Sequence, residues 1–237
     1  MFSLPNSLPL LSCLALTGLA VPAHAAVFSF EFNTAGNTEG WTASAAPANA
    51  LVTGFKQATG IDGISGVLTS DDVEIDPQIL RTGAANTITL PAGEKWSTFE
   101  TRFRHLSGNP GAVGTAATAY NSNGTILFFN NATTNLGTGP LTTKSVAGTG
   151  AYATDTYTLT LTTDPAGGEW QLLSVSFAAA PVLGGQNFTA IRFDPIGNDA
   201  AKNFEIDYIR VTSVPEAGSA ALALLGAGTV LGRRRRK

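Results

Sequence analysis

Residues 156–177 read TYTLTLTTDPAGGEWQLLSVSF, two apolar runs joined by a turn. In the first run, tyrosine and leucine alternate with threonine, a period of two that predicts a half-buried β-strand. Residues 164–168, Asp-Pro-Ala-Gly-Gly, have the composition of a turn. Residues 170–177 then predict a second strand, so the whole stretch is expected to form a β-hairpin.

The same period recurs at both ends of the chain. In residues 26–33, three phenylalanines alternate with Ser29, Glu31 and Asn33, and residues 203–212 predict the last strand. Further strands are expected at 51–55, 63–69, 87–90, 97–105, 125–130 and 188–193. No helical repeat is sustained between residues 26 and 213. The sequence therefore predicts an all-β fold of ten to twelve strands, a two-sheet antiparallel sandwich of jelly-roll topology.

Composition limits the classes of function. Residues 26–213 carry nine Lys and Arg against sixteen Asp and Glu, and charged residues make up only 13% of the chain. An acidic domain of this kind is a poor binder of nucleic acid. The length, 237 residues with both ends expected to be removed, suits one domain with a substantial core.

The N-terminus has the features of a secretory signal peptide. Residues 8–20 are apolar, and Ala23-His24-Ala25 fits the small-x-small rule, so cleavage is expected after Ala25. No Lys or Arg precedes Leu8, and lipidation at Cys13 is a weaker alternative. Without residues 1–25 the domain has no cysteine and one histidine, His105, which we expect at the surface. Disulfides are then excluded, as are zinc sites built on Cys or several His.

The C-terminus has the features of a membrane segment. Residues 217–232 carry no charge, and five cations follow: Arg233, Arg234, Arg235, Arg236 and Lys237. A helix of sixteen residues is roughly 24 Å long, slightly under a bilayer core of about 30 Å. We expect a short transmembrane helix whose cations stay on the cytoplasmic side. An ordinary membrane anchor is the main alternative, and a buried core helix a weaker one.

The residues just before this segment carry a resemblance. Val214-Pro215-Glu216, followed by the apolar run and the Arg cluster, resembles the PEP-CTERM sorting signal, with Ala217 where that family usually has a second proline. The resemblance implies a substrate of an exosortase, a membrane enzyme that cleaves near the motif and passes the protein to the surface or its polysaccharide matrix. The expected organisation is a signal peptide (1–25), a passenger domain (26–213) and a sorting tail (214–237).

The passenger domain carries a second, more diffuse resemblance at its two ends. The pattern F-x-F-E-F with Gly40-Trp41, together with residues 191–195 and 206–211, looks like the galactose-binding-like jelly rolls of carbohydrate-binding modules. The resemblance implies a structural calcium held by Glu31 and Asp207, with backbone carbonyls completing the oxygen ligands that calcium prefers. The alternative is that both carboxylates are solvated strand residues.

No set of residues forms a convincing active site. Asp71, Asp72, Glu74 and Asp76 contain the carboxylate pair that glycoside hydrolysis needs, but four acids so close together are typical of a solvated loop or a cation site. Glycan binding uses exposed aromatic faces that stack on sugars. The candidates are Trp41, Trp96, Trp170 and Tyr120, each explained equally well as core or rim packing.

These features predict an exported, non-catalytic protein of the envelope, cell surface or extracellular matrix. The expected partners are signal peptidase, an exosortase, the inner membrane transiently and extracellular polysaccharide. Three functions remain open: glycan binding, a purely structural role without a small ligand, and a glycan-active enzyme. Coplanar aromatics exposed in a groove would favour the first, burial of every tryptophan the second, and two facing carboxylates in a cleft the third.

Overall fold

The structure is a computed structural model of the chain. It describes residues 25–43, 52–73, 78–108, 111–113, 125–130, 134–135, 145–147, 155–167, 169–195 and 202–216. They belong to one compact unit, His24–Glu216. The expected signal helix and C-terminal transmembrane helix lie outside these residues. Within the described part of the chain, no helix has the length and hydropathy needed to cross a bilayer.

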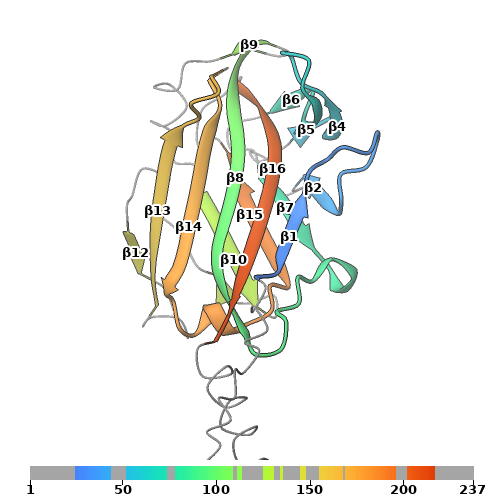
Figure 1. Cartoon of the computed structure of the whole chain (residues 1–237). Coiled ribbons are helices and arrows are strands. Elements are labelled where there is room, and N and C mark those ends of the chain that lie inside the picture. The colour runs from blue at the N-terminus through green and yellow to red at the C-terminus, as the bar shows by residue number, and fades with distance from the viewer. Residues whose placement is uncertain are drawn as a thin grey trace, which may run out of the picture. The chain divides into compact units, whose positions relative to one another are not determined.

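The larger of two main sheets is built around two long central strands, β8 (Glu94–Gly108) and β16 (Lys202–Pro215) (Figure 1). One side of β8 pairs with β14 (Gln171–Ala179), followed by β13 (Thr156–Thr163) and β12 (Ser145–Ala147). The far edge of β16 is shared by β5 (Ser65–Thr69), which continues to β4 (Lys56–Thr59), and by β1 (Val27–Phe30). A short β9 (Gly111–Val113) also pairs with β8. We call this the large sheet.

The smaller sheet lies behind the large one in Figure 1. Its strands, in order, are β11 (Thr134–Asn135), β10 (Thr125–Asn130), β15 (Ala190–Asp194), β7 (Ile79–Thr82) and β2 (Trp41–Ala43). A two-stranded piece, β3 (Val52–Thr53) with β6 (Asp72–Val73), and two 3-10 turns, η2 (Ala84–Asn86) and η4 (Leu183–Gly185), complete the described elements. Strand pairing in both main sheets is antiparallel. The all-β sandwich is therefore confirmed.

The hairpin expected at residues 156–177 is confirmed as β13–β14, whose closing pair is Thr163 with Gln171. Five of its side chains belong to the core between the two sheets: Tyr157, Leu159, Leu173, Val175 and Phe177. There Phe103 of the large sheet meets Phe193 of the small sheet edge-to-face, with ring centroids 5.2 Å apart. Each fully buried side chain of this size stabilises the fold by about 1.5–3 kcal/mol, so the core holds the two layers together.

The two central strands each contain a β-bulge. In β16, Ile206 pairs with Phe103 and Tyr208 with Arg102, which leaves Asp207 as the extra residue. Phe204, Ile206 and Ile209 are all core residues. Regular alternation would point Ile209 away from the core, and the extra residue restores its inward direction. A second irregularity lies at the start of β8, between its pairs with Thr212 and Ser213.

Several strands differ from the expectation. Sixteen strands lie within the described residues, more than predicted. At 87–90 the structure has a single bridge, Ile88 with Phe188, in place of a strand. His105, expected at the surface, is buried because it shares the core-facing side of β8 with Phe103. Strand β16 continues past Ser213, as Val214 pairs with Lys95 and Pro215 with Glu94.

Candidate functional site

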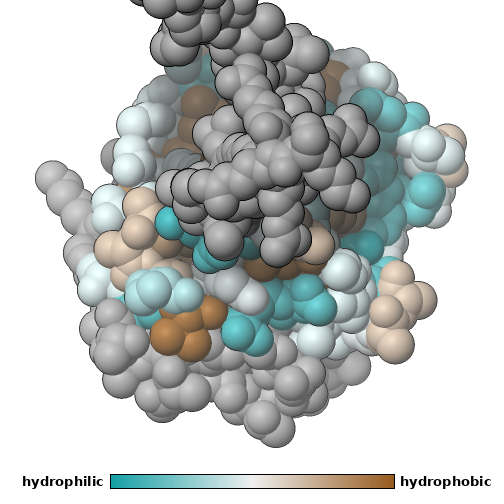
Figure 2. Space-filling model, turned by 60° about the horizontal axis from the view of Figure 1, so that its bottom comes forward, coloured by the Kyte–Doolittle hydropathy of each residue, from teal (hydrophilic) through white to brown (hydrophobic). Residues whose placement is uncertain are grey.

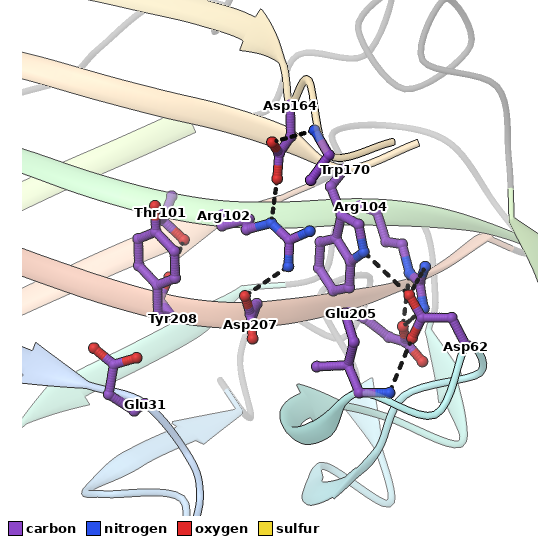
Figure 3. A network of polar contacts seen from close by, with 12 residues as sticks. Glu31, Asp62, Thr101, Arg102, Arg104, Asp164, Trp170, Glu205, Asp207 and Tyr208 are labelled. Carbon is purple, nitrogen blue, oxygen red and sulfur yellow. Dashed lines mark hydrogen bonds and ion pairs between the residues drawn. The ribbon is translucent and has the colours of Figure 1, made fainter. Parts of the chain in front are cut away.

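The side of the large sheet that faces away from the small sheet is lined with charged residues. Successive strand residues alternate between the two faces, so Phe99, Thr101 and Phe103 of β8 point one way and the charged residues between them the other. We call this second side the outer face. Figure 3 shows its charged and aromatic residues: Arg102 and Arg104 on β8, Glu205, Asp207 and Tyr208 on β16, and Glu31, Asp62, Asp164 and Trp170 around them.

The most buried part of the outer face is an ion pair between Arg104 and Glu205. Their side chains are 0% and 2% exposed, and Nε of Arg104 lies 2.7 Å from Oε2 of Glu205. Nη1 of Arg104 also donates to Asp62 at 2.8 Å, and the backbone N–H of Ile61 donates to Glu205 at 2.9 Å. Buried charges are tolerated only when paired and hydrogen-bonded. The turn at residues 60–64 supplies the groups that meet this requirement.

Arg102, two residues earlier on β8, joins two other segments. Its Nε donates to Asp164 at 2.6 Å and its Nη1 to Asp207 at 2.7 Å. Burial alone would lower the pKa of Arg102, but hydrogen bonds to the two carboxylates outweigh it and raise the pKa. The pKa of Asp164 is lowered, first by the backbone N–H of Ala166 and then by Arg102. Arg102 therefore fixes the β13–β14 turn to the bulge of β16.

Trp170 lies between these two arginines on the outer face (Figure 3). The guanidinium carbons of Arg102 and Arg104 are 4.3 and 4.2 Å from its ring centroid, a distance typical of cation–π contacts. Its indole N–H donates to Asp62 at 3.3 Å, and the residue is only 1% exposed. The turn at 60–64 and the turn at 164–170 are thus joined through one indole ring.

A more exposed group lies further along β16. Arg210 forms two hydrogen bonds to Glu31, at 2.9 and 3.2 Å, and its guanidinium lies 3.9 Å from the ring centroid of Tyr208. The hydrogen bond from Arg210 lowers the pKa of Glu31. Burial, followed by the hydrogen bond to Glu100 at 2.7 Å, raises the pKa of Tyr208. This group links β1 to β16 on the outer face.

The predicted glycan-binding aromatics are not exposed where the structure describes them. Trp41 and Trp96 belong to the core, where Trp96 stacks on Phe188 at 5.0 Å and donates its indole N–H to the backbone of Gln186. Trp170 is covered on the outer face, and Tyr120 lies outside the described residues. None of the three tryptophans offers a free ring face to a sugar.

The two predicted calcium ligands contact different arginines, Glu31 with Arg210 and Asp207 with Arg102. Among the described residues, no group of three or more His, Cys, Asp or Glu side chains is arranged to hold a metal ion. Calcium binding therefore stays a prediction, and an ion at either carboxylate would compete with a guanidinium group.

The acidic stretch is described only in part. Asp71 forms an exposed ion pair with Lys56, and Asp72 lies in β6 opposite Thr53. Glu74 and Asp76 lie outside the described residues, so the carboxylate pair considered for hydrolysis is not seen as a pair.

Sequence reasoning missed the arginines that organise the outer face. Arg104 meets partners 42 and 101 residues away, and Arg102 meets partners 62 and 105 residues away. The only local signal is the alternation of charged residues with phenylalanines in β8. Because their pKa values are lowered, Glu31, Asp62 and Asp164 stay ionised near neutral pH and act as ion-pair acceptors. The ion pairs of the outer face therefore attach the turns at 60–64 and 164–170 to the large sheet.

No protein-family model matches the sequence, and a search of curated proteins returns no match either.

Proposed function

We propose that the chain is an exported, non-catalytic surface protein whose sandwich, of jelly-roll type, is a structural unit of the cell envelope or its exopolysaccharide. The observation that carries this proposal is the burial of Trp41, Trp96 and Trp170, at 0%, 1% and 1% exposure. Protein sites that stack on sugars need open aromatic faces. Here the aromatic rings are used to pack the core and to join turns on the outer face.

The sorting tail, residues 214–237, supports the location. It contains, in this order, the motif Val214-Pro215-Glu216, an apolar run and a cluster of cations. This arrangement is the one expected of a C-terminus that is held in a membrane. In this proposal signal peptidase removes residues 1–25, the tail holds the domain at the inner membrane transiently, and an exosortase releases it to the surface.

A glycan array with the full chain in detergent, with and without calcium, tests the structural role. We expect no glycan to bind in either condition. Saturable binding of any glycan would replace the structural role with the glycan-binding function considered from the sequence.

Fractionation of producing cells tests the location. Deleting residues 217–237 is expected to move the protein from the envelope to a soluble fraction. Replacing Pro215 and Glu216 with alanine is expected to block processing while the envelope association remains. Unchanged processing would mean that the tail is a plain membrane anchor.

A further inference from the structure

The two termini of the described domain leave the sandwich at the same end. The backbone N–H of Ser213 donates to the carbonyl of Ala26 at 2.9 Å, and that of Glu216 donates to the carbonyl of Gly93 at 2.9 Å. Residues 91–95 and 180–187 lie at this end too, because they adjoin the start of β8 and the end of β14, which are paired antiparallel. We call the set formed by residues 25–28, 90–96, 179–187 and 212–216 the tail end.

Chain continuity places this end close to any membrane that the tail enters. The last described residue is Glu216, and the uncharged apolar run begins at Ala217 with no polar spacer between them. The domain therefore cannot move far from the point where the run enters lipid. Its tail end is the part that the chain holds nearest to the bilayer surface.

The tail end is also the less charged end of the sandwich. Its ionisable side chains are Glu94, Lys95 and Glu216. At the opposite end, where the turns at 60–64 and 164–170 meet, the structure places the following charged residues: Asp62, Arg102, Arg104, Asp164, Glu169, Glu205 and Asp207.

Exposed apolar side chains are concentrated at the tail end. Val27 is 56% exposed and Val182 36% exposed, and these are two of the three exposed large hydrophobic residues in the described part of the chain. The exposed Ala92 and Pro181 add to them. Figure 2 turns the bottom of the Figure 1 view, where β16 ends, toward the reader and shows brown and tan residues among the hydrophilic ones.

We propose that the tail end is a lipid-contacting surface, with Val27 and Val182 seated in the interfacial region of the bilayer that holds the tail. This inference rests on the proposed membrane attachment of residues 217–237 and goes beyond it, because the tail alone does not fix which surface of the domain faces lipid. Two valines would bind a membrane weakly from solution. Covalent attachment to a segment held in the bilayer raises their effective concentration, to about the millimolar range for short connections, so weak contacts become populated.

Site-specific fluorescence in the full chain tests the proposal. Cys13 is the only cysteine, so Cys13→Ser allows single cysteines to be placed by Val27→Cys, by Val182→Cys and, as a matched control, by Ile61→Cys. Ile61 is also an exposed hydrophobic residue, at 46%, but lies at the opposite end beside Glu205. Glu205 pairs with Arg104, which lies ten residues along β8 from Glu94 of the tail end. A strand of that length spans roughly 33 Å, so the control position is far from the proposed lipid contact.

Each variant is labelled with an environment-sensitive thiol dye and reconstituted into phosphatidylcholine vesicles, with and without lipids that carry a nitroxide quencher near the headgroup. We expect the labels at 27 and 182 to be quenched at least about twofold more than the label at 61. Melting curves of the three labelled variants check that the fold is retained.

Equal quenching at all three positions, or quenching at none in chains that float with the vesicles, would overturn the proposal. A change in emission at 27 and 182 that needs no quencher lipid and grows with protein density would assign this end to a second copy of the chain. If the chains fail to float with vesicles, the membrane attachment in the proposed function fails and this inference falls with it. The glycan array is independent of all these outcomes.

Discussion

Replacing Arg104 with methionine is expected to destabilise the sandwich strongly. Methionine fills much of the same volume, but Glu205, only 2% exposed, then loses its main ion-pair partner. Removing one member of a buried ion pair costs about 3–5 kcal/mol. For a domain of this size, about 2–4 °C is lost per kcal/mol, so the melting temperature should fall by roughly 6–20 °C.

The matched control is Arg210→Met on the same face. Arg210 of β16 and Glu31, the residue after β1, also form an arginine–carboxylate pair, but their side chains are 38% and 39% exposed. Exposed pairs contribute about 0–1 kcal/mol. The difference between the two variants therefore measures burial, because the chemistry removed is the same.

Chemical denaturation of the two single variants and of Arg104→Met/Glu205→Leu supplies the assay. The double variant should recover most of the loss, because no uncompensated charge remains in the buried site. A loss for Arg104→Met no greater than that for Arg210→Met would refute the reasoning. So would a double variant as unstable as the single one.

Three further predictions concern pH, backbone and metal. The pKa of Asp164 is lowered in the folded protein. The stabilisation that Asp164 contributes is therefore present above its unfolded pKa of about 4 and is lost as the pH falls through its folded pKa. Asp164→Asn should therefore flatten the decline in melting temperature below pH 5. Gly66→Ala should destabilise more than Gly63→Ala in denaturant titrations, since both have positive φ but only a Cβ at Gly66 would meet a backbone oxygen, at 2.8 Å. EDTA should leave the melting temperature unchanged, because Glu31 and Asp207 already bind arginines; a calcium-dependent rise would support the predicted calcium site.

Period two predicted the hairpin at 156–177 and the terminal strands because burial of alternate residues is a local property of a strand. The order of strands is not local. β8 pairs with β16 along nearly its whole length although about a hundred residues separate them. No sequence pattern within either strand predicts which strand it pairs with. The sandwich class was therefore predictable, while the central position of these two strands was not.

The bulge in β16 lies between these cases. Phe204 and Ile206 have one parity and Ile209 the other, so the sequence does contain the break in alternation. The position of the extra residue depends on the partner strand, which pairs Phe103 with Ile206 and Arg102 with Tyr208. That register brings Asp207 to Arg102, a contact that no sequence pattern announces.

The outer face was hidden for a different reason. Asp62 and Asp164 lie in turns, where composition predicts a loop but not the direction of a side chain. Trp170 was ambiguous because an aromatic residue after a turn suits a sugar platform and a packed ring equally well. In the structure the guanidinium carbons of Arg102 and Arg104 lie 4.3 and 4.2 Å from its ring centroid, so the ring is packed. Both arginines come from a strand more than sixty residues earlier.

The folded domain ends a few residues after Ser213, the boundary that the sequence predicts. Val214 and Pro215 still pair with β8, and the N–H of Glu216 still bonds to Gly93. Proline lacks an N–H, so it is suited to the last pair of a ladder, where only its carbonyl is needed. If the motif is processed as proposed, the enzyme must therefore bind these residues before β16 pairs with β8, or after its last pairs have opened.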